Sequence, residues 1–82
     1  MKILIDERTY EGSATEIMEQ LRQQTFDPTE YPDTESYIYQ LRSNYIRATD
    51  LDCPLPESGV EQQARTMFSH LAKAGALTIL EE

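Results

Sequence analysis

The apolar residues of the chain follow two different spacings, one at its two ends and another between them. Residues 2 to 5 (KILI) and 76 to 80 (ALTIL) are short runs of mostly branched apolar residues, which is typical of strands. Residues 9 to 11 are expected to return as a further strand after a turn at residues 6 to 8. No Asn-Gly or Gly-Gly pair marks a tight hairpin there.

Between these runs the apolar spacing becomes helical. Ser13, followed three residues later by Glu16, forms a capping box that satisfies two otherwise unpaired backbone donors. We therefore predict a helix over residues 14 to 24. Its apolar face consists of Ala14, Ile17, Met18 and Leu21.

A polar segment with two prolines follows this helix. Phe26 is expected to fold back on the core, and residues 27 to 33 (DPTEYPD) read as a connector. Within it, Asp27, Pro28 and Glu30 are expected to support one short helical turn.

The next segment predicts a second helix, from Asp33 or Thr34 to about Thr49, because no proline or glycine interrupts it. At about 100° per residue, one arc carries a predicted core stripe that consists of Thr34, Tyr37, Ile38, Leu41, Tyr45 and Ala48. The other arc carries Tyr39, Arg42, Ser43, Ile46 and Arg47. A tyrosine and an isoleucine exposed beside two arginines have the composition of an interface, so we predict that these five residues bind a partner.

A third helix is predicted to begin after Ser58, which forms a second capping box with Glu61. It is expected to end near Ala74, with Gly75 in the position that favours a left-handed residue. Its apolar stripe consists of Val60, Ala64, Met67, Phe68, Leu71 and Ala74.

The predicted order is β(β)αααβ, an α+β fold in which three helices pack on one face of a small two- or three-stranded sheet. Strands at both ends of the chain imply that KILI and the terminal LTIL are neighbours in that sheet, with Leu77 and Ile79 on the same side. The two termini then lie close together. The edges of such a sheet invite pairing with a second chain. With 82 residues, the chain is expected to form a single domain, residues 1 to 82.

The composition is acidic, with a formal net charge of -8. This charge opposes nonspecific attraction to nucleic acids and to anionic membranes. Residues 1 to 35 carry 9 acids and 3 bases, a net of -6, whereas residues 36 to 82 carry 6 acids and 4 bases, a net of -2. The asymmetry hints that different faces of the protein meet solvent and a partner. One cysteine and the early charges of MKILIDER predict a cytoplasmic protein without a signal peptide or membrane span.

The segment DLDCPLPESGVE, residues 50 to 61, matches an EF-hand loop at only three ligand positions, Asp50, Asp52 and Glu61. Prolines stand at the fifth and seventh positions, and a leucine stands where the sharp turn requires glycine. We therefore expect a proline-braced loop without calcium.

Other catalytic and cofactor motifs are also missing from the sequence. One cysteine and one histidine, Cys53 and His70, cannot complete a zinc site by themselves. The three glycines are isolated, so no phosphate-binding loop is present. We predict no cofactor, no metal, no small-molecule substrate and no enzymatic activity.

The preferred hypothesis is a noncatalytic interaction domain that binds another protein or a second copy of itself. An alternative is a nucleic-acid-binding protein that reads bases with Arg42, Asn44 and Arg47, although the chain has only seven bases to contact phosphates. A third hypothesis is a small enzyme or metal protein, for which the candidate residues are Asp50, Asp52, Cys53 and His70.

Overall fold

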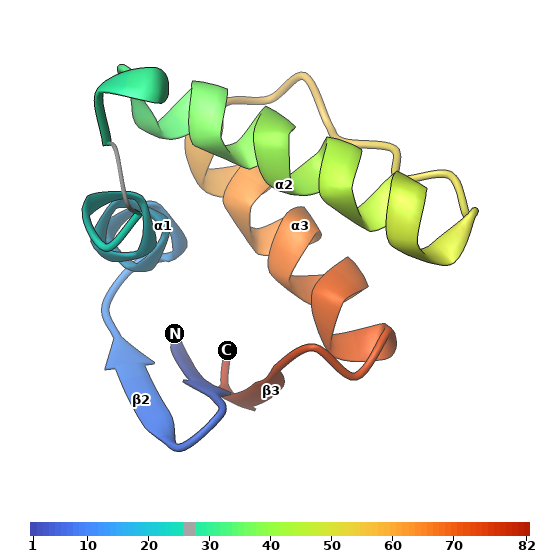
Figure 1. Ribbon diagram of the computed structural model, residues 1–82. Helices are drawn as coiled ribbons and strands as arrows, with labels where there is room; N and C mark the ends of the chain where they lie inside the picture. The colour runs from blue at the N-terminus through green and yellow to red at the C-terminus, as the bar shows by residue number, and fades with distance from the viewer. Residues whose placement is uncertain (26–27) are drawn as a thin grey trace.

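The computed structural model describes residues 1–25 and 28–82 (Figure 1). The expectations for Phe26 and Asp27 therefore lie outside the described residues. The elements are β1 (Lys2–Ile5), β2 (Arg8–Glu11), α1 (Ala14–Gln23), the short 3₁₀ helix η1 (Pro28–Glu30), α2 (Thr34–Thr49), α3 (Val60–Lys73) and β3 (Thr78–Glu81). This is the predicted α+β order β(β)αααβ.

The three strands form one antiparallel sheet in the order β2-β1-β3. Ile5 pairs with Arg8, so the turn between β1 and β2 contains only Asp6 and Glu7. Asp6 adopts φ 55°, a left-handed conformation that aspartate tolerates better than most residues. The hairpin is thus tight without the glycine pair that normally marks one. Lys2 lies opposite Glu81, which brings the two termini together as predicted (Figure 1).

The helices lie on one side of the sheet (Figure 1). The helices α1 and α2 pack against α3 and against each other, and α3 packs against β3. Two strands, the three α-helices, the connector after α2 and the residue before β3 contribute to one buried core, which consists of Ile3, Tyr10, Ala14, Ile17, Met18, Ile38, Tyr45, Cys53, Ala64, Met67, Phe68 and Leu77.

The start of α1 confirms the first capping box. The backbone N–H of Glu16 donates to Ser13 Oγ at 3.0 Å, and the backbone N–H of Ser13 donates to Glu16 Oε1 at 3.1 Å. Later in α1, the carboxylate of Glu19 accepts hydrogen bonds from Arg22 of the same helix and from the Thr34 hydroxyl, which lies at 2.7 Å. This second contact ties α1 to the first turn of α2.

The second predicted capping box is wrong. The helix α3 begins after Gly59, which has φ 114°, and Ser58 does not cap it. The Glu61 carboxylate instead accepts hydrogen bonds from the first turn of α1: from the backbone N–H of Ala14 at 3.2 Å, and from the Thr15 backbone N–H at 2.9 Å and hydroxyl at 2.8 Å. These α1 donors have no partner within their own helix, and the packing of α3 beside α1 brings a carboxylate to them.

The end of α3 follows the prediction. Gly75 has φ 82° and donates its N–H to Ala72 O at 3.1 Å, while Ala76 donates to Leu71 O at 2.9 Å. This pair of bonds is the Schellman motif, which reverses the chain toward β3. In β3, Ile79 faces Ile3 of β1 across the sheet.

Candidate functional site

The orientation of α2 about its axis differs from the prediction. Of its predicted core stripe, Ile38 and Tyr45 are buried, whereas Tyr37 and Leu41 are only half-buried and Ala48 is exposed. The helix is therefore rotated about its axis relative to the prediction. The stripe is buried along one margin, with Ile38 and Tyr45, and is open to the surface along the other. Tyr37, Leu41 and Ala48 share the open margin, where they lie within roughly 40° of one another on a helix of 3.6 residues per turn.

The opposite arc of α2 is partly covered by the connector, residues 50 to 59, which runs back along the helix (Figure 1). Arg42 is half-buried and donates through Nε to the Cys53 carbonyl at 2.7 Å. Ile46 is also half-buried and packs against the core. The predicted exposure of Arg42 and Ile46 was therefore wrong. The spacing of apolar residues within α2 does not show that the following segment folds back on the helix.

Three of the five predicted interface residues do lie at the surface. Tyr39 is 45% exposed, and Ser43 and Arg47 are exposed as well. Arg47 donates to the Asn44 side-chain oxygen at 3.0 Å. The binding of a partner by this arc stays a prediction.

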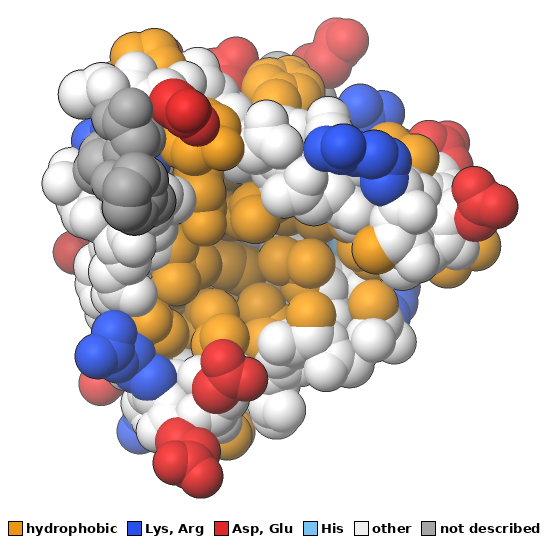
Figure 2. All heavy atoms as spheres, in the orientation of Figure 1, with side chains coloured by type: hydrophobic (Ala, Val, Ile, Leu, Met, Phe, Trp, Pro, Cys, Tyr) orange, Lys and Arg blue, Asp and Glu red, His pale blue; other side chains and the backbone are white. Residues whose placement is uncertain are grey.

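On the open margin of α2, three adjoining cavities form a hollow in the molecular surface (Figure 2). Their volumes are about 500, 270 and 410 Å³. Thr25 and Tyr37 line both the first and the second cavity, and Leu41 and Asn44 line both the second and the third, so the three are continuous. We call this surface the apolar hollow, after its principal apolar residues Ile5, Leu21, Tyr37, Leu41, Ala48 and Leu71.

The principal apolar residues of the apolar hollow come from four elements, one of which is α2. Ile5 belongs to β1, Leu21 to α1 and Leu71 to α3, and each was predicted as an apolar strand or stripe position. All three are only partly buried. Sequence reasoning assigned them to the core and missed the hollow, because apolar spacing is the same whether the chain itself or another molecule covers a residue.

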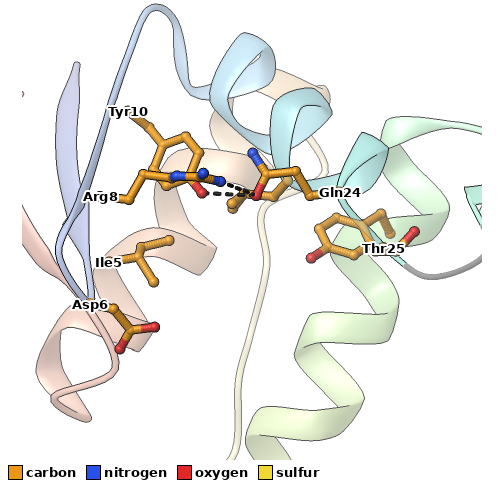
Figure 3. A pocket seen from close by; sticks show the side chains of 8 residues that line it. Ile5, Asp6, Arg8, Tyr10, Gln24 and Thr25 are labelled. Carbon is orange, nitrogen blue, oxygen red and sulfur yellow. Dashed lines mark hydrogen bonds between the residues drawn. The ribbon is translucent and has the colours of Figure 1, made fainter.

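Figure 3 shows the first cavity, between the hairpin and the N-terminal half of α2. The Tyr10 hydroxyl donates to Gln24 Oε1 at 2.9 Å, and Arg8 Nη1 lies 3.4 Å from the same oxygen. Farther along the hollow, the rings of Tyr31 and Tyr37 meet edge to face with centroids 5.5 Å apart. Burial, and then the proximity of Tyr31 and Tyr10, raises the pKa of Tyr37, so its hydroxyl remains a hydrogen-bond donor at neutral pH.

Of the four groups considered for catalysis, Cys53 and His70 contact the core and the connector, and Asp50 and Asp52 are exposed. Cys53 is completely buried, its thiol lies 3.9 Å from Met67 Sδ, and burial raises its pKa, which disfavours the nucleophilic thiolate. His70 lies under the connector, with Nε2 3.3 Å from Pro54 O and its ring 5.6 Å from that of Tyr45. No group of three or more metal-binding side chains occurs within residues 1–25 and 28–82.

Comparisons with known proteins add no function. The chain matches no family model, no curated protein and no solved structure. In the described part of the chain, none of the helices has the length and apolar content that a bilayer crossing requires.

Proposed function

We propose that the protein is a noncatalytic interaction domain whose receptor surface is the apolar hollow. The observation that carries this proposal is the half-open core stripe of α2, in which Tyr37, Leu41 and Ala48 are patterned like core residues yet are only partly covered by the described chain. Contiguous exposed apolar surface of this kind, rimmed by polar groups, is typical of protein-binding sites.

The chemistry of the apolar hollow favours binding over catalysis. Its polar lining is mainly neutral, with the side chains of Gln24, Gln40 and Asn44 among its members. The described lining residues include no histidine, cysteine or lysine, the usual sources of bases and nucleophiles at neutral pH.

The exposed arc of α2 remains a second candidate contact surface. Tyr39, Ser43 and Arg47 are available there. Arg42 is hydrogen-bonded to the connector and Ile46 packs against the core, so these two would act only indirectly. The same contact weakens the nucleic-acid alternative, since Arg42 is engaged with the Cys53 carbonyl and Asn44 with Arg47. The cytoplasm remains the compartment that we propose, because the single cysteine is a free thiol.

Two tyrosines on α2 provide a matched test of the two surfaces. Tyr37 lines the apolar hollow, and Tyr39 lies on the exposed arc. Each is replaced in turn by the photoreactive residue p-benzoylphenylalanine in cells of the source organism, and covalent adducts are identified by mass spectrometry after irradiation.

We expect adducts to a specific protein, either foreign or a second copy, from position 37 and not from position 39. Adducts from position 39 alone would move the binding surface to the exposed arc. The absence of adducts from both positions would refute an interaction domain built on α2.

A further inference from the structure

The connector, which runs back along α2, is held in place by side chains (Figure 1). Its residues 51 to 58 belong to no helix or strand, and they make no backbone-to-backbone hydrogen bond with the residues that the structure describes. Three of its carbonyl groups instead contact side chains of α2 and α3: Arg42 Nε lies 2.7 Å from the Cys53 oxygen, Gln63 Nε2 lies 3.2 Å from the Pro56 oxygen, and His70 Nε2 lies 3.3 Å from the Pro54 oxygen.

The middle of the connector is stiff. Pro54 and Pro56 have a fixed φ, and each restricts the residue before it to extended conformations. Four successive residues, 53 to 56, are therefore confined to an extended backbone. A segment of this kind moves as one piece, because its own dihedral angles have little freedom to change.

The two ends of the connector have the properties of hinges. Asp50 is the C-terminal cap of α2 with φ 60°, and Gly59 is the N-terminal cap of α3 with φ 114°. Aspartate tolerates a left-handed backbone and glycine adopts it freely. Apart from the chain neighbours of Gly59, no described atom lies within 4 Å of the position that a Cβ would take there. Residues at the ends of elements are where hinge motions normally concentrate their changes in φ and ψ.

The closed position of the connector leaves one polar atom unsatisfied. Gln63 is only 7% exposed, and although its amide nitrogen contacts Pro56, its Oε1 accepts no hydrogen bond from the described residues. A buried acceptor without a donor raises the free energy of the closed form. Release of Pro56 opens the same amide group to water, so part of the cost of breaking the contact is recovered.

We propose that the connector is a strap that opens as one unit about hinges at Asp50 and Gly59 while the sheet and the three α-helices stay folded. Opening breaks the three carbonyl contacts together and exposes Cys53, the connector's one contribution to the described core. It also frees Arg42, which lies on the exposed arc of α2. The closed strap thus withholds a cationic hydrogen-bond donor from that arc, whichever surface of α2 binds a partner.

Cys53 reports directly on this opening, because it is the only cysteine of the chain and is buried when the strap is closed. Folded wild-type protein is treated with a chromogenic disulfide reagent at urea concentrations below the unfolding transition. We expect Cys53 to react faster than global unfolding allows by about tenfold or more, with a urea dependence about half as steep or less, since opening exposes little surface. A rate and a urea dependence equal to those of global unfolding would overturn the proposal.

A variant that does not alter the Cys53 contact tests whether the strap opens as one unit. His70→Phe keeps a ring beside Tyr45 and removes the contact with Pro54. Because opening as a unit breaks every contact before Cys53 is exposed, we expect His70→Phe to accelerate the modification of Cys53 by about threefold or more. An unchanged rate would mean that Cys53 is released by itself and would overturn opening as one unit.

The corresponding variant on α2 is Arg42→Met, which keeps the aliphatic part of the side chain and removes a charge-assisted hydrogen bond. We expect it to accelerate the modification of Cys53 by about tenfold or more. Arg47→Met, whose guanidinium contacts Asn44, is the matched control and should leave the rate unchanged. Urea denaturation of each variant gives its own global unfolding rate limit. An acceleration no larger than the change in that limit would count against the strap.

Discussion

Glu61 shows how a single side chain can serve an element other than its own. It belongs to α3, yet its carboxylate accepts three hydrogen bonds from Ala14 and Thr15 at the start of α1, and it pairs with Arg65 at 2.9 Å. Burial raises the pKa of Glu61, but the bonds from Thr15, Arg65 and Ala14 outweigh this effect and lower it to about 2. The residue therefore joins two helices while capping one of them.

We expect Glu61→Gln to lower the free energy of unfolding by about 1 to 2 kcal/mol, because the neutral amide is a weaker acceptor for the unpaired donors of α1. Urea denaturation at pH 7 measures the change. Glu57→Gln, at an exposed acid of the connector, is the control and should have little effect. A loss equal to that of the control would contradict the capping role.

The orientation of α2 is decided at the scale of elements. The connector contributes the buried side chain of Cys53 to the core, and the Cys53 carbonyl accepts a hydrogen bond from Arg42. This hydrogen bond holds the margin of α2 that carries Arg42 against the connector. Because the helix is rigid, the same orientation places the margin with Tyr37 and Leu41 in the lining of the apolar hollow. A segment outside the helix thus determines which of its apolar residues remain open.

Two aliphatic residues of α2 test this orientation. We expect Ile38→Ala to lower the free energy of unfolding by about 2 to 5 kcal/mol, because Ile38 is fully buried and its removal leaves a cavity. Leu41→Ala should cost less than half as much in monomeric protein, since its side chain already borders the hollow. Denaturation at a low protein concentration makes the comparison, and equal losses would show that Leu41 is sealed.

The contact between Arg42 and the connector predicts a change in thiol reactivity. We expect Arg42→Ala to cost about 1.5 to 3 kcal/mol of stability, because it removes a charge-assisted hydrogen bond. The loosened connector should also increase the rate at which a thiol reagent modifies Cys53 in the folded protein. Arg47→Ala, five residues along the same helix, should leave that rate unchanged. Identical rates in both variants would show that Arg42 does not hold the connector in place.

At the scale of the whole molecule, two low-pKa carboxylates connect the three helices. Glu61 links α3 to α1, and Glu19 links α1 to α2 through Thr34. Hydrogen bonds from Arg22, Thr34 and Gln23 lower the pKa of Glu19 to about 2, compared with its ordinary value of 4.5. Both carboxylates bind protons more readily in the unfolded chain than in the folded one.

The free energy of unfolding should therefore decrease at acid pH. A lowered folded-state pKa contributes stability that is fully present above about pH 4.5 and is lost as the pH falls toward 2. We expect the free energy of unfolding to be nearly constant from pH 5 to 7 and to decline below that range. Glu19→Gln and Glu61→Gln should each flatten the decline. A curve that keeps its wild-type slope in both variants would assign the acid sensitivity to other groups.

The sequence by itself determined the order of elements, the first capping box, the ends of the three helices to within a residue or two, and the pairing of the two terminal strands. These features depend on local spacing and on hydrogen bonds between near neighbours, which the sequence displays directly. The rotation of α2, the role of Glu61 and the apolar hollow were decided only by the tertiary structure. Each of them depends on a contact between segments that are distant along the chain. Apolar spacing alone cannot show whether such a contact buries a residue or leaves it exposed.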